Sequence, residues 1–273
     1  MTASARINPT GYISTAATTA MAQAKLKKKI NGTFDGSKKN FAVLDLFSGI
    51  GGFSLGLERA GPFRTVAFCE RDKFCQAVLK KHWPGTPIYD DVRTLNFRGG
   101  VDVITSGDPC QRDSRANARR DGGSMWPWTL QQIRQHRPLY VIRENVLGNI
   151  DTGTLEQVEG DLVREGYEVR SYIINAAAIG AAHDRPRTWT LAYSDRAGRK
   201  KRDHAPQPGA PEQRVYPVLT GPDGLCWMGS EPPVLRRIDD VPRRVDRIRS
   251  LGNAVVPQVV TQIGKAIIEA EGA

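Results

Sequence analysis

The stretch "FAVLDLFSGIGGFSLGLERAG" (residues 41–61) decides the fold. Its first seven residues form an apolar run of strand length, which the turn "SGIGG" (48–52) follows. The segment "FSLGLERAG" (53–61) then has apolar residues at helical spacing and ends in glycine. A strand joined to a helix through glycines is typical of a doubly wound α/β sheet, in which ligands bind at the carboxyl ends of the strands.

The same alternation of strand and helix patterns continues along the chain. It predicts a mostly parallel, doubly wound sheet of Rossmann-like type. A further helix near residues 258–270 is expected to pack beside the cofactor-binding half. The predicted strands are 65–70, 87–92, 101–107, 139–145 and 168–176, and the predicted helices between them are 73–83, 129–138 and 155–167.

Composition sets limits on the function. The 273 residues are long enough to bury one sizeable core, and the net charge of +10 indicates a polyanionic partner. Seven of the first 40 residues are Lys or Arg and one is Asp, which predicts a flexible basic arm, the alternative being a tail that only aids solubility. The four cysteines form no C-x-x-C pair, and neither a cleavable leader nor a membrane-spanning run is visible. We expect a cytoplasmic protein without a metal site.

The glycine turn and two acidic strand ends predict a nucleoside cofactor. Gly49, Gly51 and Gly52 lack side chains, so backbone N–H groups can approach a ligand closely. Glu70 ends the next strand about twenty residues on, where a carboxylate can accept both ribose hydroxyls. Many NAD-binding domains have a similar turn, so the pattern by itself leaves the cofactor open. Asp91 could accept from an adenine amino group or be a simple strand-end residue.

Two further strands are followed by residues with reactive side chains. Cys110 lies in "DPCQ" after the strand 101–107, and Glu144 ends the strand 139–145. Both should emerge at the edge of the sheet that holds the glycine turn, where a thiolate could attack a ring while the glutamic acid protonates a ring nitrogen. An isolated cysteine is more often a small buried apolar residue, but the polar loop around Cys110 argues against that.

These motifs, in this order, resemble those of the cytosine-C5 DNA methyltransferase family, especially its small phage and bacterial members. The resemblance covers roughly residues 41–194 and 230–270. The motifs that carry it are "DLFSGIGGFSLGLERAG", "CERDKFC", "DDV", "PCQ", "ENV", "HDRPR" and "RVDRIRSLGNAVVPQV".

The resemblance implies a role for each matching residue, with S-adenosylmethionine in place of NAD. Cys110 would attack C6 of a cytosine flipped out of double-stranded DNA, and Glu144 would protonate N3. Arg185 and Arg187 would steady the flipped base and its flanking backbone, and Asn253 would support the loop that carries the catalytic residues. The implied cofactor contacts are Phe47 on the adenine, Gly49, Ile50, Gly51 and Gly52 under the methionine portion, Glu70 on the ribose, Asp91 and Val92 beside the adenine, and Pro109 and Asn253 nearby.

Several positions depart from the family pattern. Asp108 and Arg143 replace apolar residues beside Cys110 and Glu144, Arg112 and Asp113 follow "PCQ", and His183 replaces a glutamine. Asp108 should raise the pKa of Cys110 whereas Arg112 should lower it. Because the loop 114–126 is also short, a catalytically impaired DNA-binding relative is one alternative. A cytosine-C5 methyltransferase that acts on RNA is another.

The domain organisation follows from these assignments. We expect a basic arm (1–40), a catalytic and cofactor-binding domain (41–194), a short target-recognition region (195–245) and a C-terminal segment that packs back on the catalytic domain (246–273). The region 195–245 is rich in Pro, Gly and Arg, which suits phosphate contacts but equally a solvated insertion. The expected protein is a monomer, and a restriction endonuclease is one conceivable partner.

Overall fold

The computed structural model describes residues 40–109, 124–179, 185–194, 218–219 and 244–272. The expected basic arm, apart from residue 40, lies outside this part of the chain. Most of the expected recognition region and the "CQ" of the "PCQ" motif also lie outside it.

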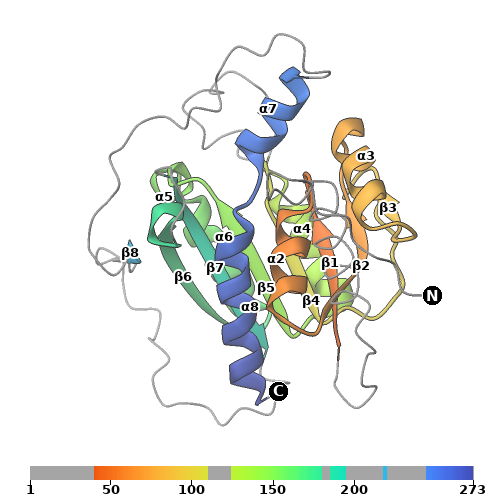
Figure 1. Ribbon diagram of the computed structural model, residues 1–273. Helices are drawn as coiled ribbons and strands as arrows, with labels where there is room; N and C mark the ends of the chain where they lie inside the picture. The colour runs from red at the N-terminus through yellow and green to blue at the C-terminus, as the bar shows by residue number, and fades with distance from the viewer. Residues whose placement is uncertain (1–39, 110–123, 180–184, 195–217, 220–243, 273) are drawn as a thin grey trace, which may run out of the picture. The chain divides into compact units, whose positions relative to one another are not determined.

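The described residues form one sheet in the order β3-β2-β1-β4-β5-β7-β6-β8. Neighbours from β3 to β5 are parallel, whereas β7 is antiparallel to both β5 and β6 (Figure 1). The predicted doubly wound, mostly parallel sheet is therefore confirmed. The strands are β1 (Phe41–Leu46), β2 (Phe63–Cys69), β3 (Ile88–Tyr89), β4 (Val103–Ser106), β5 (Tyr140–Asn145), β6 (Tyr167–Asn175), β7 (Pro186–Ser194) and β8 (Val218–Leu219).

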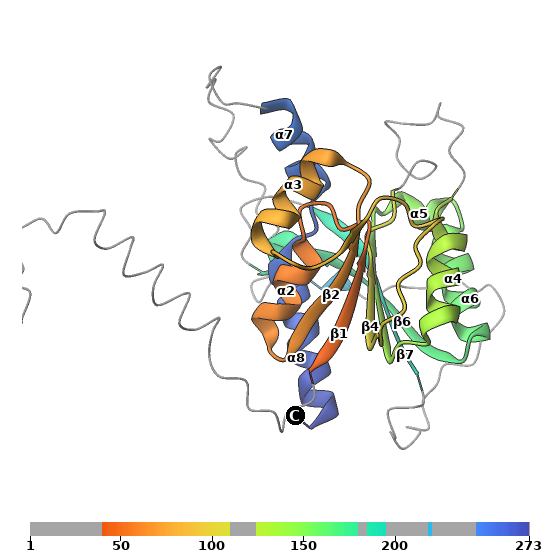
Figure 2. The same ribbon diagram turned by 90° about the vertical axis from the view of Figure 1, so that its right-hand side faces the viewer.

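Helices cover both faces of the sheet. Figure 2 shows α2 and α8 on one face and α4 and α6 on the other. Each pair buries apolar side chains against the strands, so the protein has one core on each face of the sheet. The helices are α2 (Gly52–Ala60), α3 (Lys73–His82), α4 (Trp126–His136), α5 (Gly148–Asp151), α6 (Thr154–Arg164), α7 (Arg244–Asn253) and α8 (Pro257–Glu271), with a 3-10 turn η1 (Ala176–Ile179).

Small residues bring α2 and α8 into close contact. A Cβ atom on Gly56 would lie 2.5 Å from the Cβ of Val260, and one on Gly264 would lie 2.6 Å from the Cβ of Ala60. The Thr261 hydroxyl donates to the Gly56 carbonyl at 3.0 Å. Larger side chains at these two glycines would force the helices apart, so the sequence specifies this contact through residue size.

A buried acid, Asp45, joins three elements. Its carboxylate on β1 accepts from the Thr105 hydroxyl of β4 at 2.7 Å and from the Ser54 hydroxyl of α2 at 2.8 Å. The residue has no solvent exposure. Burial raises the pKa of Asp45 to about 7, although both hydroxyl donors act to lower it.

The Asp45→Asn variant is expected to change how stability depends on pH. Because the pKa is raised in the folded state, the native protein holds the Asp45 proton between pH 4 and pH 7, whereas the unfolded chain releases it. The stability from this group is complete below about pH 4 and is lost as the pH rises towards 7, by at most on the order of 4 kcal/mol. Urea unfolding at several pH values should show the wild type losing stability relative to the variant across this range. A constant difference would contradict the assignment.

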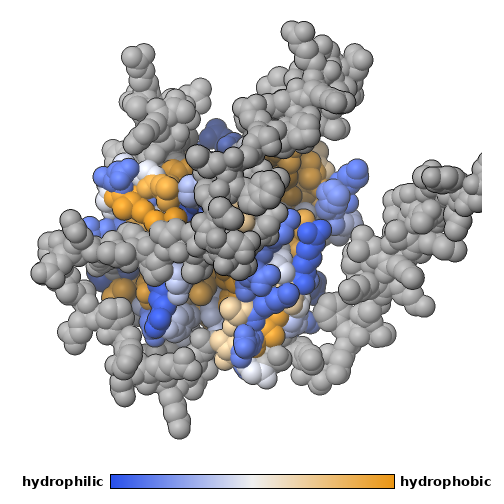
Figure 3. Space-filling view, turned by 60° about the vertical axis from the view of Figure 1, so that its left-hand side comes forward, coloured by the Kyte–Doolittle hydropathy of each residue, from blue (hydrophilic) through white to orange (hydrophobic). Residues whose placement is uncertain are grey.

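The surface of the described part is mixed in character. Figure 3 shows hydrophilic and hydrophobic residues interspersed on the face it draws. The large apolar side chains with substantial exposure in the described part are Trp128, Val163 and Leu251, which belong to three different helices, α4, α6 and α7. Among the described helices, none combines the length and the apolar character needed to cross a membrane.

Candidate active site

Four parallel strands end in one row across the sheet. Leu46 on β1 pairs with Cys69 on β2 and with Ser106 on β4, and Ser106 pairs with Arg143 on β5. The segments that follow these four residues therefore emerge at the same edge. This edge carries the glycine turn, Glu70, the chain leading to Cys110, and Glu144.

The turn after β1 has an unusual backbone. Phe47 and Gly49 both have φ of 54°, and Gly51 has φ of 86°. This conformation costs a non-glycine residue such as Phe47 about 1–3 kcal/mol, and such residues gather at ligand sites. The Ser48 hydroxyl holds the turn by donating to the Asp45 carbonyl at 2.6 Å. A Cβ atom on Gly49 would meet no heavy atom within 4 Å, so this glycine borders open space.

Glu70 lies beside that open space and is held by two backbone groups. One oxygen accepts from the Gly49 N–H at 2.7 Å, and the other accepts from the Asp72 N–H at 2.7 Å. A carboxylate can accept about four hydrogen bonds, so each oxygen keeps capacity for one more donor. A fixed acid with two remaining acceptor positions suits a vicinal diol such as a ribose.

Close packing within the protein explains why positions 51 and 52 are glycines. A Cβ atom on Gly51 would lie 2.6 Å from the Trp83 ring, and one on Gly52 would lie 2.6 Å from the Val255 carbonyl oxygen. Ile50, directly before Gly51, is partly buried. The turn is therefore packed against the protein on one side, which leaves Gly49 as the glycine that borders open space.

Asp91 is paired with an arginine, whereas Val92 is buried in the core. Arg93 binds the Asp91 carboxylate through Nε, at 2.9 and 3.0 Å, and through Nη2. Hydrogen bonds from the Arg93 side chain lower the pKa of Asp91 to about 2. Val92 is 4% exposed and belongs to the core. The Asp91 carboxylate thus has an arginine partner that the sequence did not predict.

Two other cysteines are unsuited to nucleophilic attack. Cys69 and Cys75 are buried and free of disulfides. Burial raises the pKa of Cys69 to about 12 and that of Cys75 to about 11. Both therefore stay protonated near neutral pH, and the thiolate is the reactive form. Cys110 lies outside the described residues, although Pro109, directly before it, is described and exposed.

Glu144 is buried at the end of β5. It is 9% exposed, and the Nε of Arg187 lies 3.2 Å from its Oε1. Burial raises the pKa of Glu144, whereas the positive charges of Arg187, Arg185 and Arg143 oppose the rise. A raised pKa keeps a larger share of the group protonated near neutral pH, which suits a general acid.

The two arginines after η1 have different contacts. Arg187 pairs with Glu144, but Arg185 reaches the last turn of α7 and the residue that follows this helix. Its guanidinium donates to the Gly252 carbonyl at 2.7 Å and to the Ala254 carbonyl at 3.1 Å, on either side of the exposed Asn253. Arg185 thus holds the segment that carries Asn253, while Arg187 is the arginine in contact with the acid.

Comparison with known proteins identifies the family. Residues 41–218 match the family described as C-5 cytosine-specific DNA methylase. The chain belongs to this family. The expected resemblance is therefore confirmed, and the match includes the turn after β1, Glu70, Glu144 and both arginines.

Curated methylases and solved structures are similar to this chain. Methyltransferase M.HgiCII of Herpetosiphon aurantiacus is 31% identical over 66% of this chain and 43% of its own length, and M2.BsuMI of Bacillus subtilis is 32% identical over 55% and 41%. The DNMT2 structure from Spodoptera frugiperda has a TM-score of 0.52 at 19% identity, covering 66% of this chain and 55% of that one. That likeness supports the fold. The chain spans less than half the length of these two curated relatives.

The motif pattern does not point to several residues in and around this candidate site. It did not include Asp45, nor did it pair Asp91 with Arg93. Asp108 and Arg143 were noted only as separate departures from the family pattern, yet they form one buried ion pair with the Arg143 Nε 2.7 Å from the Asp108 Oδ1. Two opposite charges that both replace apolar residues are the signal that could have predicted it.

Proposed function

We propose that this protein is a DNA (cytosine-5-)-methyltransferase that uses S-adenosylmethionine, a flipped cytosine and a covalent Cys110 adduct. The observation that carries the proposal is the pair between buried Glu144 and partly buried Arg187, in which Glu144 lies at the end of the strand beside the segment that leads to Cys110. An acid with a raised pKa next to a cysteine motif fits attack on a ring whose nitrogen must be protonated.

The cofactor would bind at the turn after β1. Glu70 would accept the ribose hydroxyls with the two acceptor positions that its backbone partners leave, and Gly49 would let the methionine portion approach. S-adenosylmethionine would supply a methyl group on a positively charged sulfur. The carboxylate of Asp91 would stay paired with Arg93 and lie beside the adenine.

In the proposed reaction, Cys110 forms a covalent bond to the base and Glu144 transfers a proton. The Cys110 thiolate adds to C6 of cytosine while Glu144 donates its proton to N3, which places the electron pair on C5. C5 would take the methyl group from the sulfonium sulfur, which would leave as the neutral thioether, and water would then accept the C5 proton. Cys110 is expelled as the 5,6 double bond re-forms, and the N3 proton returns to Glu144. Arg187 would stabilise the carboxylate between these two transfers.

The target should be short. The expected recognition region has about fifty residues, and each bidentate contact to a base edge contributes about 1–3 kcal/mol of discrimination. A site on the order of two to four base pairs follows from so few contacts. The basic balance of the chain supports binding to the phosphates of duplex DNA.

The direct test supplies the purified protein with methyl-labelled S-adenosylmethionine and either duplex DNA or tRNA. We expect label in DNA, and bisulfite sequencing of DNA from expressing cells should find 5-methylcytosine in one short context. Label only in tRNA would favour an RNA methyltransferase. Cofactor binding without transfer to either polymer would favour the catalytically impaired relative.

Changing Glu70 to alanine should weaken cofactor binding. The variant loses the charged acceptor for the ribose and the contact that orders Gly49, and hydrogen bonds to a charged group contribute about 1.5–3 kcal/mol. Calorimetry should therefore record a dissociation constant for S-adenosylmethionine that is at least about 10-fold higher. The surface change Glu156→Ala serves as the control and should leave the affinity as it is. Equal affinities in the two variants would exclude the ribose assignment.

A further inference from the structure

Asp108 and Arg143 form a buried, bidentate ion pair next to the proposed catalytic residues. The Arg143 Nε donates to one carboxylate oxygen at 2.7 Å, and Nη2 donates to the other at 2.8 Å. The side chains are 3% and 1% exposed, respectively. Paired in this way, the charge of Asp108 is neutralised by Arg143, so this acid adds little net charge two residues before Cys110 in the sequence.

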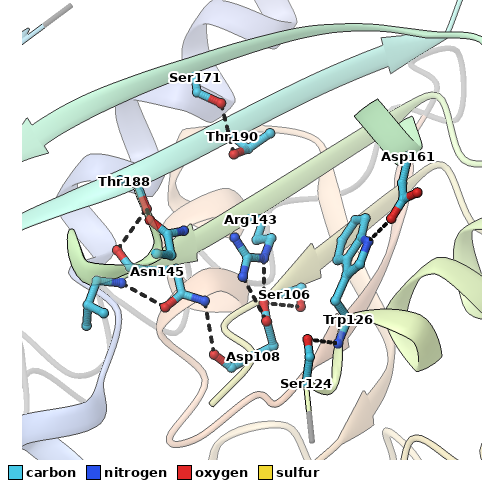
Figure 4. Close-up of polar contacts among 12 residues, drawn as sticks. Ser106, Asp108, Ser124, Trp126, Arg143, Asn145, Asp161, Ser171, Thr188 and Thr190 are labelled. Atoms are coloured by element: carbon cyan, nitrogen blue, oxygen red, sulfur yellow. Dashed lines mark hydrogen bonds and ion pairs between the residues drawn. The ribbon is translucent and has the colours of Figure 1, made fainter. Parts of the chain in front are cut away.

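Arg143 is also fixed on its other side. Its guanidinium carbon lies 5.7 Å from the centre of the Trp126 ring, and the Trp126 Nε1 donates to Asp161 on α6 at 2.7 Å. Figure 4 shows the guanidinium of Arg143 directed at the Asp108 carboxylate, with the Trp126 ring to one side. Arg143 therefore joins the segment after β4 to the first residue of α4 and, through Trp126, to α6.

Asp108 is held by the residues on both sides of Glu144 in the sequence. Arg143 binds its carboxylate, and the Asn145 Nδ2 donates to its carbonyl oxygen at 3.4 Å. Successive side chains of a strand point to opposite faces, so Arg143 and Glu144 lie on opposite faces of β5. The pair thus fixes the backbone that presents Glu144 without occupying the face on which Glu144 meets Arg187.

Energetics favour a role other than simple stabilisation. A buried ion pair contributes little net stability compared with well-packed apolar residues, whereas one partner left alone is strongly unfavourable. What the charges add is direction, because a guanidinium and a carboxylate bind in one planar geometry.

We propose that the Asp108–Arg143 pair is a positioning element that fixes Glu144 relative to the chain entering Cys110, so that acid and nucleophile meet the same base. The inference rests on the proposed function. Asp108 lies two residues before Cys110, and Arg143 directly precedes Glu144. A shift of about 1 Å between such groups can reduce a reaction rate about 100-fold.

The test is a double-mutant cycle measured on methyl transfer to DNA. The proteins are the wild type, Asp108→Val, Arg143→Met, and the double variant, with Arg134→Met as a matched arginine control on the exposed face of α4. Each single variant should lose kcat by about 100-fold with an unchanged dissociation constant for S-adenosylmethionine, and the double variant should return to within about 10-fold of the wild type. The control should match the wild type.

A pH profile separates positioning from mere folding. Four charged groups affect the pKa of Glu144: Arg187 on β7, Arg185 directly before β7, Arg143 on β5 and Asp108 after β4. Arg143→Met removes a charge that lowers the pKa of Glu144, so the alkaline limb of kcat should move to higher pH. Asp108→Val removes a charge that raises it, so the limb should move to lower pH, and the double variant should lie between the two.

Conservative variants keep the test decisive if a single variant does not fold. Arg143→Lys keeps the charge but replaces the planar fork with a point donor, so kcat should fall about 10-fold while cofactor binding stays the same. Wild-type kcat in Arg143→Lys, or a folded double variant no faster than the slower single variant, would overturn the inference. A wild-type protein that methylates nothing would overturn the proposed function and the inference together.

Discussion

Cys110→Ala is expected to abolish methyl transfer while leaving S-adenosylmethionine binding intact. Alanine has no nucleophile, so the pyrimidine ring cannot be activated at C6, and loss of a catalytic nucleophile costs on the order of 10⁴-fold or more in rate. Labelled transfer to duplex DNA measures this loss. Calorimetry with the cofactor should give the wild-type affinity, because the thiol belongs to the base site.

Duplex DNA with 5-fluorocytosine extends this test to the covalent step. Fluorine at C5 leaves no proton for the final elimination, so the wild type should stay attached to DNA when S-adenosylmethionine is present. The variant Cys75→Ala should still form the adduct, because burial keeps the Cys75 thiol protonated and unreactive. Wild-type turnover by Cys110→Ala, or an adduct that survives this change, would rule out the assigned nucleophile.

Glu144→Gln should reduce kcat by about 10²- to 10⁴-fold, the usual contribution of a general acid. The amide cannot donate an acidic proton to N3, and the low exposure of this position, 9%, limits access for a substitute acid from solvent. Wild-type kcat should fall as the pH rises through the raised pKa of Glu144, because only the protonated acid can donate. The residual rate of the variant should lack this limb.

The control for this change is Glu156→Gln, on the exposed first turn of α6. It should keep the wild-type rate and pH profile. If Glu144→Gln instead kept both, proton donation would have to come from another group, and the role of Glu144 would reduce to holding Arg187.

Much of the fold could be predicted from sequence because its signals are local. The apolar run before "SGIGG" corresponds to β1, and the helical spacing after it corresponds to α2. The sequence analysis did not predict the strand β7. Its segment "TWTLAYS" (188–194) directly follows the polar motif "HDRPR" (183–187), which is interpreted only through its two arginines. The helix α4 begins at Trp126 rather than at residue 129, since Pro127 is tolerated in the first turn.

The candidate site was predictable for residues that belong to motifs and less so for their partners. Glu144 could be found from the position of "ENV" after a strand, but its contact with Arg187 needed the antiparallel pairing of β5 with β7. The partner of Asp108 is 35 residues away and depends on the register that sets Ser106 opposite Arg143. A sequence shows charges at such positions but does not show which charges meet.

The contact between α2 and α8 also has a consequence for synthesis on the ribosome. Roughly 200 residues separate the two helices, so at bacterial and eukaryotic translation speeds α2 waits about 10–40 s for its partner. In the finished protein, Val259, Val260 and Ile267 of α8 cover apolar side chains of α2. Until α8 is made, those side chains of α2 are exposed to solvent or to a chaperone. A message cut short before residue 257 would therefore encode an aggregation-prone product rather than a smaller working enzyme.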